Sequence, residues 1–128
     1  MFGSAEIVTN LPATDLDRAR RFYQDTLGLK PLVAPAPDMI AFEAGNGTKL
    51  MLYQRGPTKA DHTALTFLVK DVGAAVDALN RKGVQMQQYD MPGIQTDARG
   101  IVAQGDDQIA WFLDTEGNIL SVATAPKT

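Results

Sequence analysis

Apolar residues at helical spacing mark two segments of the chain, one in each half. The apolar face of the first segment consists of Leu16, Ala19, Tyr23 and Leu27. A capping box of Thr14 and Asp17 is expected to begin this helix, and Gly28 to end it. The apolar face of the second segment consists of Val72, Ala75, Val76 and Leu79. Asp71 is expected to cap this second helix and Gly83 to end it.

Short apolar runs bounded by turn residues predict strands in the rest of the chain. In the first half these runs cover residues 5–11, 32–33, 39–43 and 49–54. In the second half they cover residues 63–69, 84–89, 108–113 and 119–123. The turn signals Gly45-Asn46-Gly47 and Thr115-Glu116-Gly117-Asn118 separate the last two strands of each half. Each half therefore has the order βαβββ.

Residues 90–107 break this periodicity with several Gly, Pro and Asp residues. A stretch of this length without regular structure is often a functional loop or a lid over a site. The alternative is a short edge strand around Ile101-Val102-Ala103 between two turns, and the sequence leaves both interpretations open.

The two halves repeat one pattern: residues 8–15 correspond to residues 64–71, and residues 47–52 correspond to residues 117–122. An internal repeat of this kind indicates two copies of one supersecondary unit. We expect an α+β fold in a single domain, residues 1–128, with tandem βαβββ units at about 1–56 and 60–125. Their strands would form a curved mixed sheet around a cleft, with the helices outside.

Composition narrows the classes of function. The net charge of −3 and the acidic isoelectric point argue against nucleic-acid binding, which usually requires a basic face. The chain has no cysteine, which excludes disulfides, thiolate nucleophiles and cysteine-ligated metals. No apolar run reaches the length of a membrane span, and residues 1–6 do not resemble a signal peptide. We therefore expect a cytoplasmic protein with no nucleic-acid or membrane partner.

Four motifs carry a resemblance to a known family: Asp15–Tyr23 (D-L-D-R-A-R-R-F-Y), Leu27-Gly28-Leu29, Phe67–Val72 (F-L-V-K-D-V) and Asp114–Leu120 (D-T-E-G-N-I-L). With these motifs, nearly the whole chain resembles the vicinal oxygen chelate superfamily. This superfamily includes glyoxalase I, extradiol dioxygenases, fosfomycin-modifying enzymes and bleomycin-binding proteins. The motifs are typical of the superfamily's fold and are not specific for one activity.

The resemblance implies a divalent metal held by His, Glu or Gln on the first and last strands of each unit, where it acts as a Lewis acid. In this sequence the corresponding positions are Val8, Met51, Ala64 and Ser121. A shift of one residue brings in no better donors: Thr9, Leu50, Leu65 and Leu120. Since such ions need imidazole or carboxylate donors, we expect no metal and no other cofactor.

His62 is the only histidine and the only candidate catalytic residue. It lies two residues before Ala64, so the two side chains share one face of a strand and His62 can reach the rim of the cleft. Imidazole exchanges protons near neutral pH, which suits a general base. Two alternatives are a polar contact to a ligand and an exposed strand start after Asp61.

Strand alternation predicts which side chains line the cleft. The predicted lining is apolar with a few hydroxyl groups, as is common in small-molecule pockets. The predicted ligand-binding residues are Val8, Asn10, Met51, Tyr53, His62, Ala64, Thr66, Trp111 and Ser121. The sequence does not decide whether Trp111 or Phe112 points inward, and plain core packing is the alternative for Met51.

Three functions follow. The first is a metal-free, non-enzymatic protein that resembles the bleomycin-resistance branch and binds a small hydrophobic or planar molecule. The second is a lyase or oxidoreductase of the glyoxalase or dioxygenase type, with an atypical site near His62 and candidate carboxylates at Asp61, Glu43 and Asp90. The third is a dimeric interaction module without a ligand. A homodimer is compatible with each of them.

Overall fold

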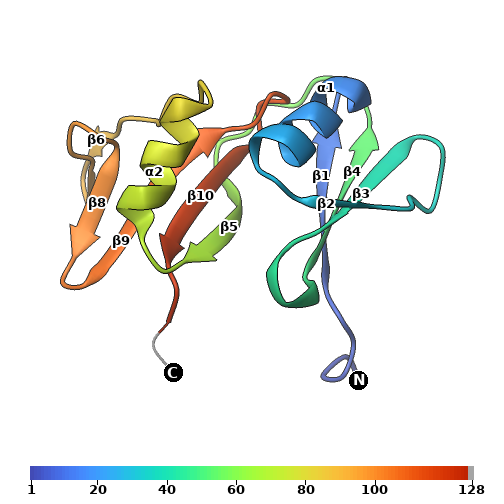
Figure 1. Ribbon diagram of the computed structural model, residues 1–128, viewed down its shortest axis with the longest axis horizontal. Helices are drawn as coiled ribbons and strands as arrows, with labels where there is room; N and C mark the ends of the chain where they lie inside the picture. The colour runs from blue at the N-terminus through green and yellow to red at the C-terminus, as the bar shows by residue number, and fades with distance from the viewer. Residues whose placement is uncertain (127–128) are drawn as a thin grey trace. The chain divides into compact units, whose positions relative to one another are not determined.

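The computed structural model describes residues 1–126, and the chain divides into two compact units between Thr58 and Lys59. Each unit consists of a four-stranded mixed sheet with a helix packed against it (Figure 1). None of the helices within residues 1–126 is long and apolar enough to cross a bilayer. The two sheets, each with its helix, confirm the predicted α+β class and the two-unit organisation of the strands.

The first unit begins with β1 (Val8–Ala13), α1 (Leu16–Arg21) and a π-helical turn, η1 (Phe22–Thr26). It continues with β2 (Lys30–Leu32), β3 (Met39–Glu43), a short 3-10 turn, η2 (Gly45–Gly47), and β4 (Lys49–Gln54). The strand order is β1-β4-β3-β2. β1 is parallel to β4, and the other pairs are antiparallel.

The second unit begins with β5 (Thr63–Val69) and α2 (Val72–Arg81). A small hairpin of β6 (Asp90–Met91) and β7 (Ile94–Gln95) follows. The unit closes with β8 (Ile101–Gln104), β9 (Asp107–Leu113) and β10 (Ile119–Thr124). Its strand order, β5-β10-β9-β8, repeats that of the first unit, again with one parallel pair.

Each unit buries one face of its sheet against its helix. In the first unit the Tyr23 ring stacks on Phe42, with ring centroids 5.9 Å apart. In the second unit Val72, Val76 and Leu79 of α2 are buried, and α2 contacts β9 and β10. The buried side chains of β9 and β10 that alternate toward this core are Ala110, Phe112, Leu120 and Val122. The opposite face of each sheet does not pack against the helix of its own unit.

The helices of the two units begin in the same way. Asp15 and Asp71 both have φ −137° and ψ 99°, and each carboxylate accepts a hydrogen bond from the backbone N–H three residues later. The N···O distances are 3.0 Å to Arg18 and 3.0 Å to Ala74. The prediction for Asp71 is confirmed. The predicted cap at Thr14 is wrong by one residue, because Asp15 takes the extended backbone conformation that a cap requires.

Removing either cap is expected to destabilise its unit by about 1 kcal/mol, because one helical N–H loses its partner. Asp15→Ala and Asp71→Ala should each show this loss in urea-induced unfolding followed by circular dichroism. Asp15→Asn and Asp71→Asn keep an acceptor and should unfold close to wild type. Asparagine variants as unstable as the alanine variants would contradict the capping role.

Several elements differ from the sequence prediction, among them the strand expected at residues 32–33, which is β2 at Lys30–Leu32. The first strand starts at Val8 rather than residue 5, and the first helix ends in a π-turn in which the Leu27 N–H donates to Phe22 O. The strand predicted at residues 84–89 is reduced to a single bridge between Met86 and Phe112. Residues 90–107 hold the β6–β7 hairpin and the edge strand β8, so the edge-strand interpretation is confirmed.

Candidate functional site

In each unit, two residues at matching positions of the repeat lie side by side on the sheet face opposite the helix. In the first unit Asn10 pairs with Met51 across β1 and β4. In the second unit Thr66 pairs with Ser121 across β5 and β10. These pairs occupy matching places in the two βαβββ patterns. Val8 and Tyr53 lie on the same face of the first unit, since each is two residues from a member of its pair.

In the second unit Trp111 lies beside Ser121, which in turn lies beside Thr66, across three adjacent strands. The Thr66 and Ser121 hydroxyl oxygens are 2.7 Å apart and share a hydrogen bond, and Ser121 is fully buried. Ala64 is half-buried on β5, two residues before Thr66. Trp111 therefore belongs to the face opposite α2, whereas Phe112 is buried in the core.

Two contacts fix the Trp111 ring. Its indole Nε1–H donates to Thr63 Oγ1 at 3.1 Å. The Tyr89 ring meets it edge to face, with centroids 5.4 Å apart and planes at 86°. A half-buried indole with its polar atom already bonded offers an apolar surface whose orientation is set before any ligand arrives.

His62 lies outside this row, one residue before β5 begins. Its Nδ1 is 3.0 Å from Asp61 Oδ1, and the two side chains are 78% and 89% exposed. The hydrogen bond from His62 and the positive charge of its ring lower the pKa of Asp61. The pair is an exposed contact at the start of a strand. Of the other two carboxylates named above, Glu43 pairs with Lys49 across β3 and β4 of the first unit, and Asp90 lies in the β6–β7 hairpin of the second.

The second unit contains a pocket of about 360 Å³ next to Trp111. Apolar side chains of β8, β9 and β10 contribute Val102, Ile109, Trp111 and Ala123. The remaining lining residues come from the β6–β7 hairpin, the adjoining ends of β8 and β9, and the end of β10: Gly93, Ile94, Gln104, Asp107, Gln108 and Thr124. The volume falls at the small end of the range typical of ligand pockets.

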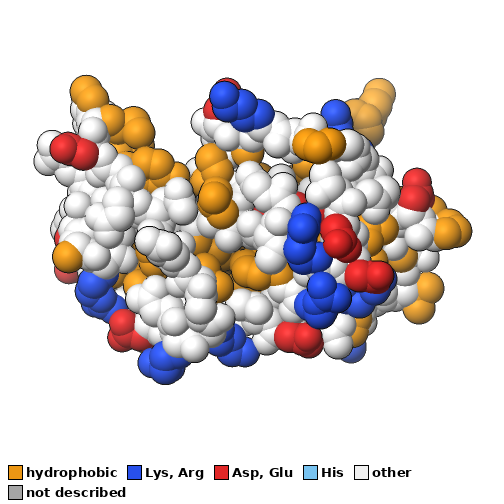
Figure 2. All heavy atoms as spheres, turned by 90° about the horizontal axis from the view of Figure 1, so that it is seen from above, with side chains coloured by type: hydrophobic (Ala, Val, Ile, Leu, Met, Phe, Trp, Pro, Cys, Tyr) orange, Lys and Arg blue, Asp and Glu red, His pale blue; other side chains and the backbone are white. Residues whose placement is uncertain are grey.

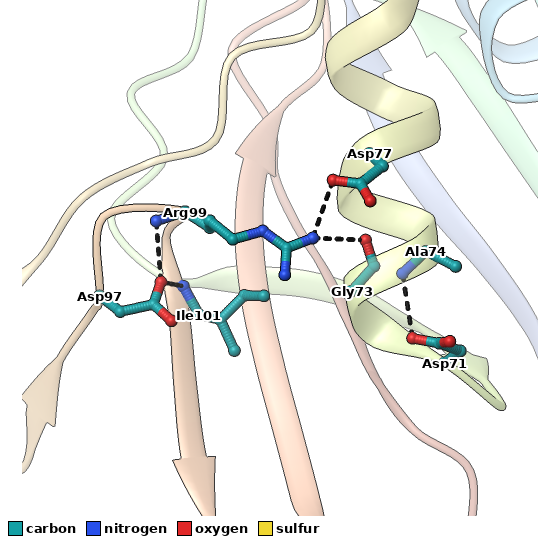
Figure 3. Close-up of polar contacts among 7 residues, drawn as sticks. All are labelled: Asp71, Gly73, Ala74, Asp77, Asp97, Arg99 and Ile101. Carbon is teal, nitrogen blue, oxygen red and sulfur yellow. Dashed lines mark hydrogen bonds and ion pairs between the residues drawn. The ribbon is translucent and has the colours of Figure 1, made fainter.

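Hydrogen bonds of Arg99 and Asp97 hold the turn before β8 (Figure 3). β8 carries Val102 and Gln104, which line the pocket. The guanidinium of Arg99 reaches α2 and donates to Gly73 O and to Asp77 Oδ1, both at 2.8 Å. Asp97 Oδ1 accepts from the backbone N–H groups of Arg99 at 2.8 Å and Ile101 at 3.0 Å. The turn before β8 is thereby tied to the helix, which positions Val102 and Gln104.

The donor set does not fit a divalent metal. Val8, Met51 and Ala64 offer no imidazole or carboxylate, and the Ser121 hydroxyl already bonds Thr66. Within residues 1–126, no three His, Asp or Glu side chains gather in a way that could hold an ion. The arrangement instead offers apolar surface, hydroxyls and amides.

Of the residues that line this pocket, the predicted ligand-binding set contains Trp111 alone. Ile109 shares the strand face of Trp111, so alternation along β9 could have indicated it. The facing of Val102 and Gln104 could not be predicted, because the sequence allows either a loop or an edge strand within residues 90–107.

Charged side chains elsewhere are mixed in sign. On the face seen in Figure 2, basic side chains lie next to acidic ones, and hydrophobic side chains are exposed on other parts of the same face. The exposed large hydrophobic residues within the described range are Met1, Phe2, Ile7, Val33, Leu68, Met91 and Leu113.

Several solved structures resemble this chain. TnmS3, described as an antibiotic binding protein from Streptomyces sp. CB03234, matches with a TM-score of 0.72 and 23% identity, covering 98% of this chain and 99% of that one. A superfamily member from Sphaerobacter thermophilus DSM 20745 matches with a TM-score of 0.72 and 17% identity, covering 97% and 99%. A glyoxalase/dioxygenase from Nostoc punctiforme matches with a TM-score of 0.69 and 17% identity, covering 98% of this chain and 94% of that one. At these identities the likeness shows the fold alone.

No curated protein is significantly similar to the chain in sequence. A family model does match residues 6–122 of the chain. The chain therefore belongs to the glyoxalase/bleomycin resistance protein/dioxygenase superfamily.

Proposed function

We propose that this protein binds a planar, apolar small molecule without a metal ion, using the sheet face of the second unit that carries Trp111. The observation that carries the proposal is the pocket of about 360 Å³ beside an indole ring whose orientation two contacts already fix. Aromatic rings stack well on such a surface, and a preset orientation lowers the entropic cost of binding.

The residues at the superfamily's metal positions support binding over metal-assisted catalysis. Their side chains, described above, lack the donors that activate a chelated substrate. The similar fold of TnmS3, described as an antibiotic binding protein, supports the same choice. A planar antibiotic or a related polycyclic metabolite is therefore the proposed class of ligand.

Within the second unit, the proposed site extends along the sheet face that carries Trp111. Thr66 and Ser121 adjoin Trp111 in the second unit, and Ala64 lies next along β5. Val8, Asn10, Met51 and Tyr53 form the corresponding face of the first unit. We keep the first-unit residues as a separate candidate set, and His62 as a proposed polar contact in the second unit, each to be tested by substitution.

The Trp111 ring is expected to contribute directly to affinity. Anthracene-9-methanol, a neutral planar probe, should bind the wild-type chain, and Trp111→Ala should weaken binding about tenfold, because stacking and buried apolar area are both lost. The fluorescence anisotropy of the probe measures this without relying on protein fluorescence. Phe2→Ala, which removes a 77% exposed ring elsewhere, is the matched control and should bind as wild type. Equal affinities for the Trp111 and Phe2 variants, or no binding by the wild type, would overturn the proposal.

A further inference from the structure

We infer that the pocket beside Trp111 selects planar ligands that carry an amine, and that Asp107 is the residue that distinguishes ligand charge. This inference rests on the proposed function and names the chemical class of its ligand. Three observations support it: the layout of the pocket floor, the polar groups that remain available at the rim, and the signs of the charges in the lining.

The floor of the pocket is a continuous apolar strip. Val102 pairs with Ile109 across β8 and β9, and Ile109 pairs with Ala123 across β9 and β10. Trp111 is two residues from Ile109 and therefore lies on the same face. The strip suits the flat apolar part of a ligand, with the indole at one end.

The polar groups of the pocket come mainly from the adjoining ends of β8 and β9, at the other end of this strip. Thr124 Oγ1 already accepts from the Gln108 backbone N–H at 2.9 Å and donates to Gln108 O at 3.4 Å. Gln104 and Asp107 pair with each other across β8 and β9, on the face that carries Val102 and Ile109, so the Gln104 amide and the Asp107 carboxylate lie at the pocket. The Gln104 amide offers both donors and an acceptor, and the Asp107 carboxylate offers only acceptors.

The charges of the lining have one sign. Asp107 is the only charged residue among the lining residues given above, which include no Lys, Arg or His. No salt bridge within residues 1–126 joins Asp107 to a basic side chain. An ammonium group at this rim gains a charge-assisted hydrogen bond, whereas a carboxylate is repelled.

Three probes of one shape and different charge test the inference: 9-(aminomethyl)anthracene, anthracene-9-methanol and anthracene-9-carboxylate. Each is titrated against the wild-type chain, Asp107→Asn and Asp106→Asn, with probe fluorescence anisotropy as the readout at low and at high salt. Asp106→Asn is the matched control, because it removes the same charge from the adjacent residue, which does not line the pocket.

The wild type should bind the amine about threefold more tightly than the alcohol, and the carboxylate about threefold more weakly, the scale expected for a solvent-exposed ion pair. Asp107→Asn should abolish this order, so that the three probes bind with similar affinities, and Asp106→Asn should keep the order. High salt should compress the differences. If the wild type binds all three probes equally, or Asp106→Asn abolishes the order as Asp107→Asn does, the inference is overturned although the proposed function stands. If the wild type binds none of them, the proposed function fails as well.

Discussion

Replacing Phe112 with alanine should lower the free energy of unfolding of the second unit by about 3–5 kcal/mol. The Phe112 side chain is 1% exposed, and its backbone pairs with Leu120 on one side and bridges to Met86 on the other. Truncation removes a large apolar group from a filled core and leaves a cavity that the two neighbouring segments can close only in part. This is a large share of the stability of an ordinary domain.

Urea unfolding measures this effect, with Trp111 fluorescence as the signal, because this tryptophan lies in the second unit and is the only one in the chain. Leu113→Ala is the matched control on the same strand, since Leu113 is 40% exposed. Its loss should stay below about 1 kcal/mol, in keeping with a substitution near the surface. A Phe112→Ala loss as small as that of Leu113→Ala would show that Phe112 is not part of the core.

Replacing Gly100 with alanine should cost about 2–4 kcal/mol, from two separate causes. Gly100 has φ +85°, a left-handed conformation that disfavours any residue with a Cβ. A Cβ there would also lie 2.9 Å from both Gln87 O and Met86 Cβ. Because one of these atoms is a backbone oxygen, the segment beside β9 must shift, and crowding of this kind adds about 1–3 kcal/mol.

Gly105→Ala separates these two causes. Gly105 has φ +61°, but a Cβ there meets no atom within 4 Å. This variant should therefore show only the conformational penalty, about 1 kcal/mol. Thermal unfolding of both variants by circular dichroism gives the comparison. Equal losses would mean that the close approach of Gly100 to residues 86–87 contributes nothing.

The features that depend on local chemistry could be predicted from the sequence. Gly28 and Gly83 adopt positive φ at the ends of the helical segments, and Asp71 caps α2, because turn and cap preferences act over a few residues. The repeat also identified Met51 and Ser121 as equivalent positions: Met51 pairs with Asn10 in the first unit as Ser121 pairs with Thr66 in the second. The choice between Thr14 and Asp15 failed because both residue types cap helices and only the backbone conformation decides between them.

The features that depend on distant contacts could not be predicted. Val84–Tyr89 has the composition of a strand, yet β8 takes the edge position beside β9 for most of its length. β8 is short and is held by Arg99, whose partners lie on α2, more than 20 residues earlier in the chain. The pocket depends on the position of β8 and of the β6–β7 hairpin, so its lining could not be predicted from periodicity.

Isothermal titration calorimetry of the chelator-treated protein tests the central claim, binding without a metal, most directly. Anthracene-9-methanol is titrated into protein from which divalent ions have been removed, and again after Zn²⁺ or Mn²⁺ has been added. The account predicts saturable binding of the probe with the same affinity in both cases, and no tight binding of either ion alone. Submicromolar, stoichiometric metal binding, or probe binding that appears only after metal is restored, would contradict it.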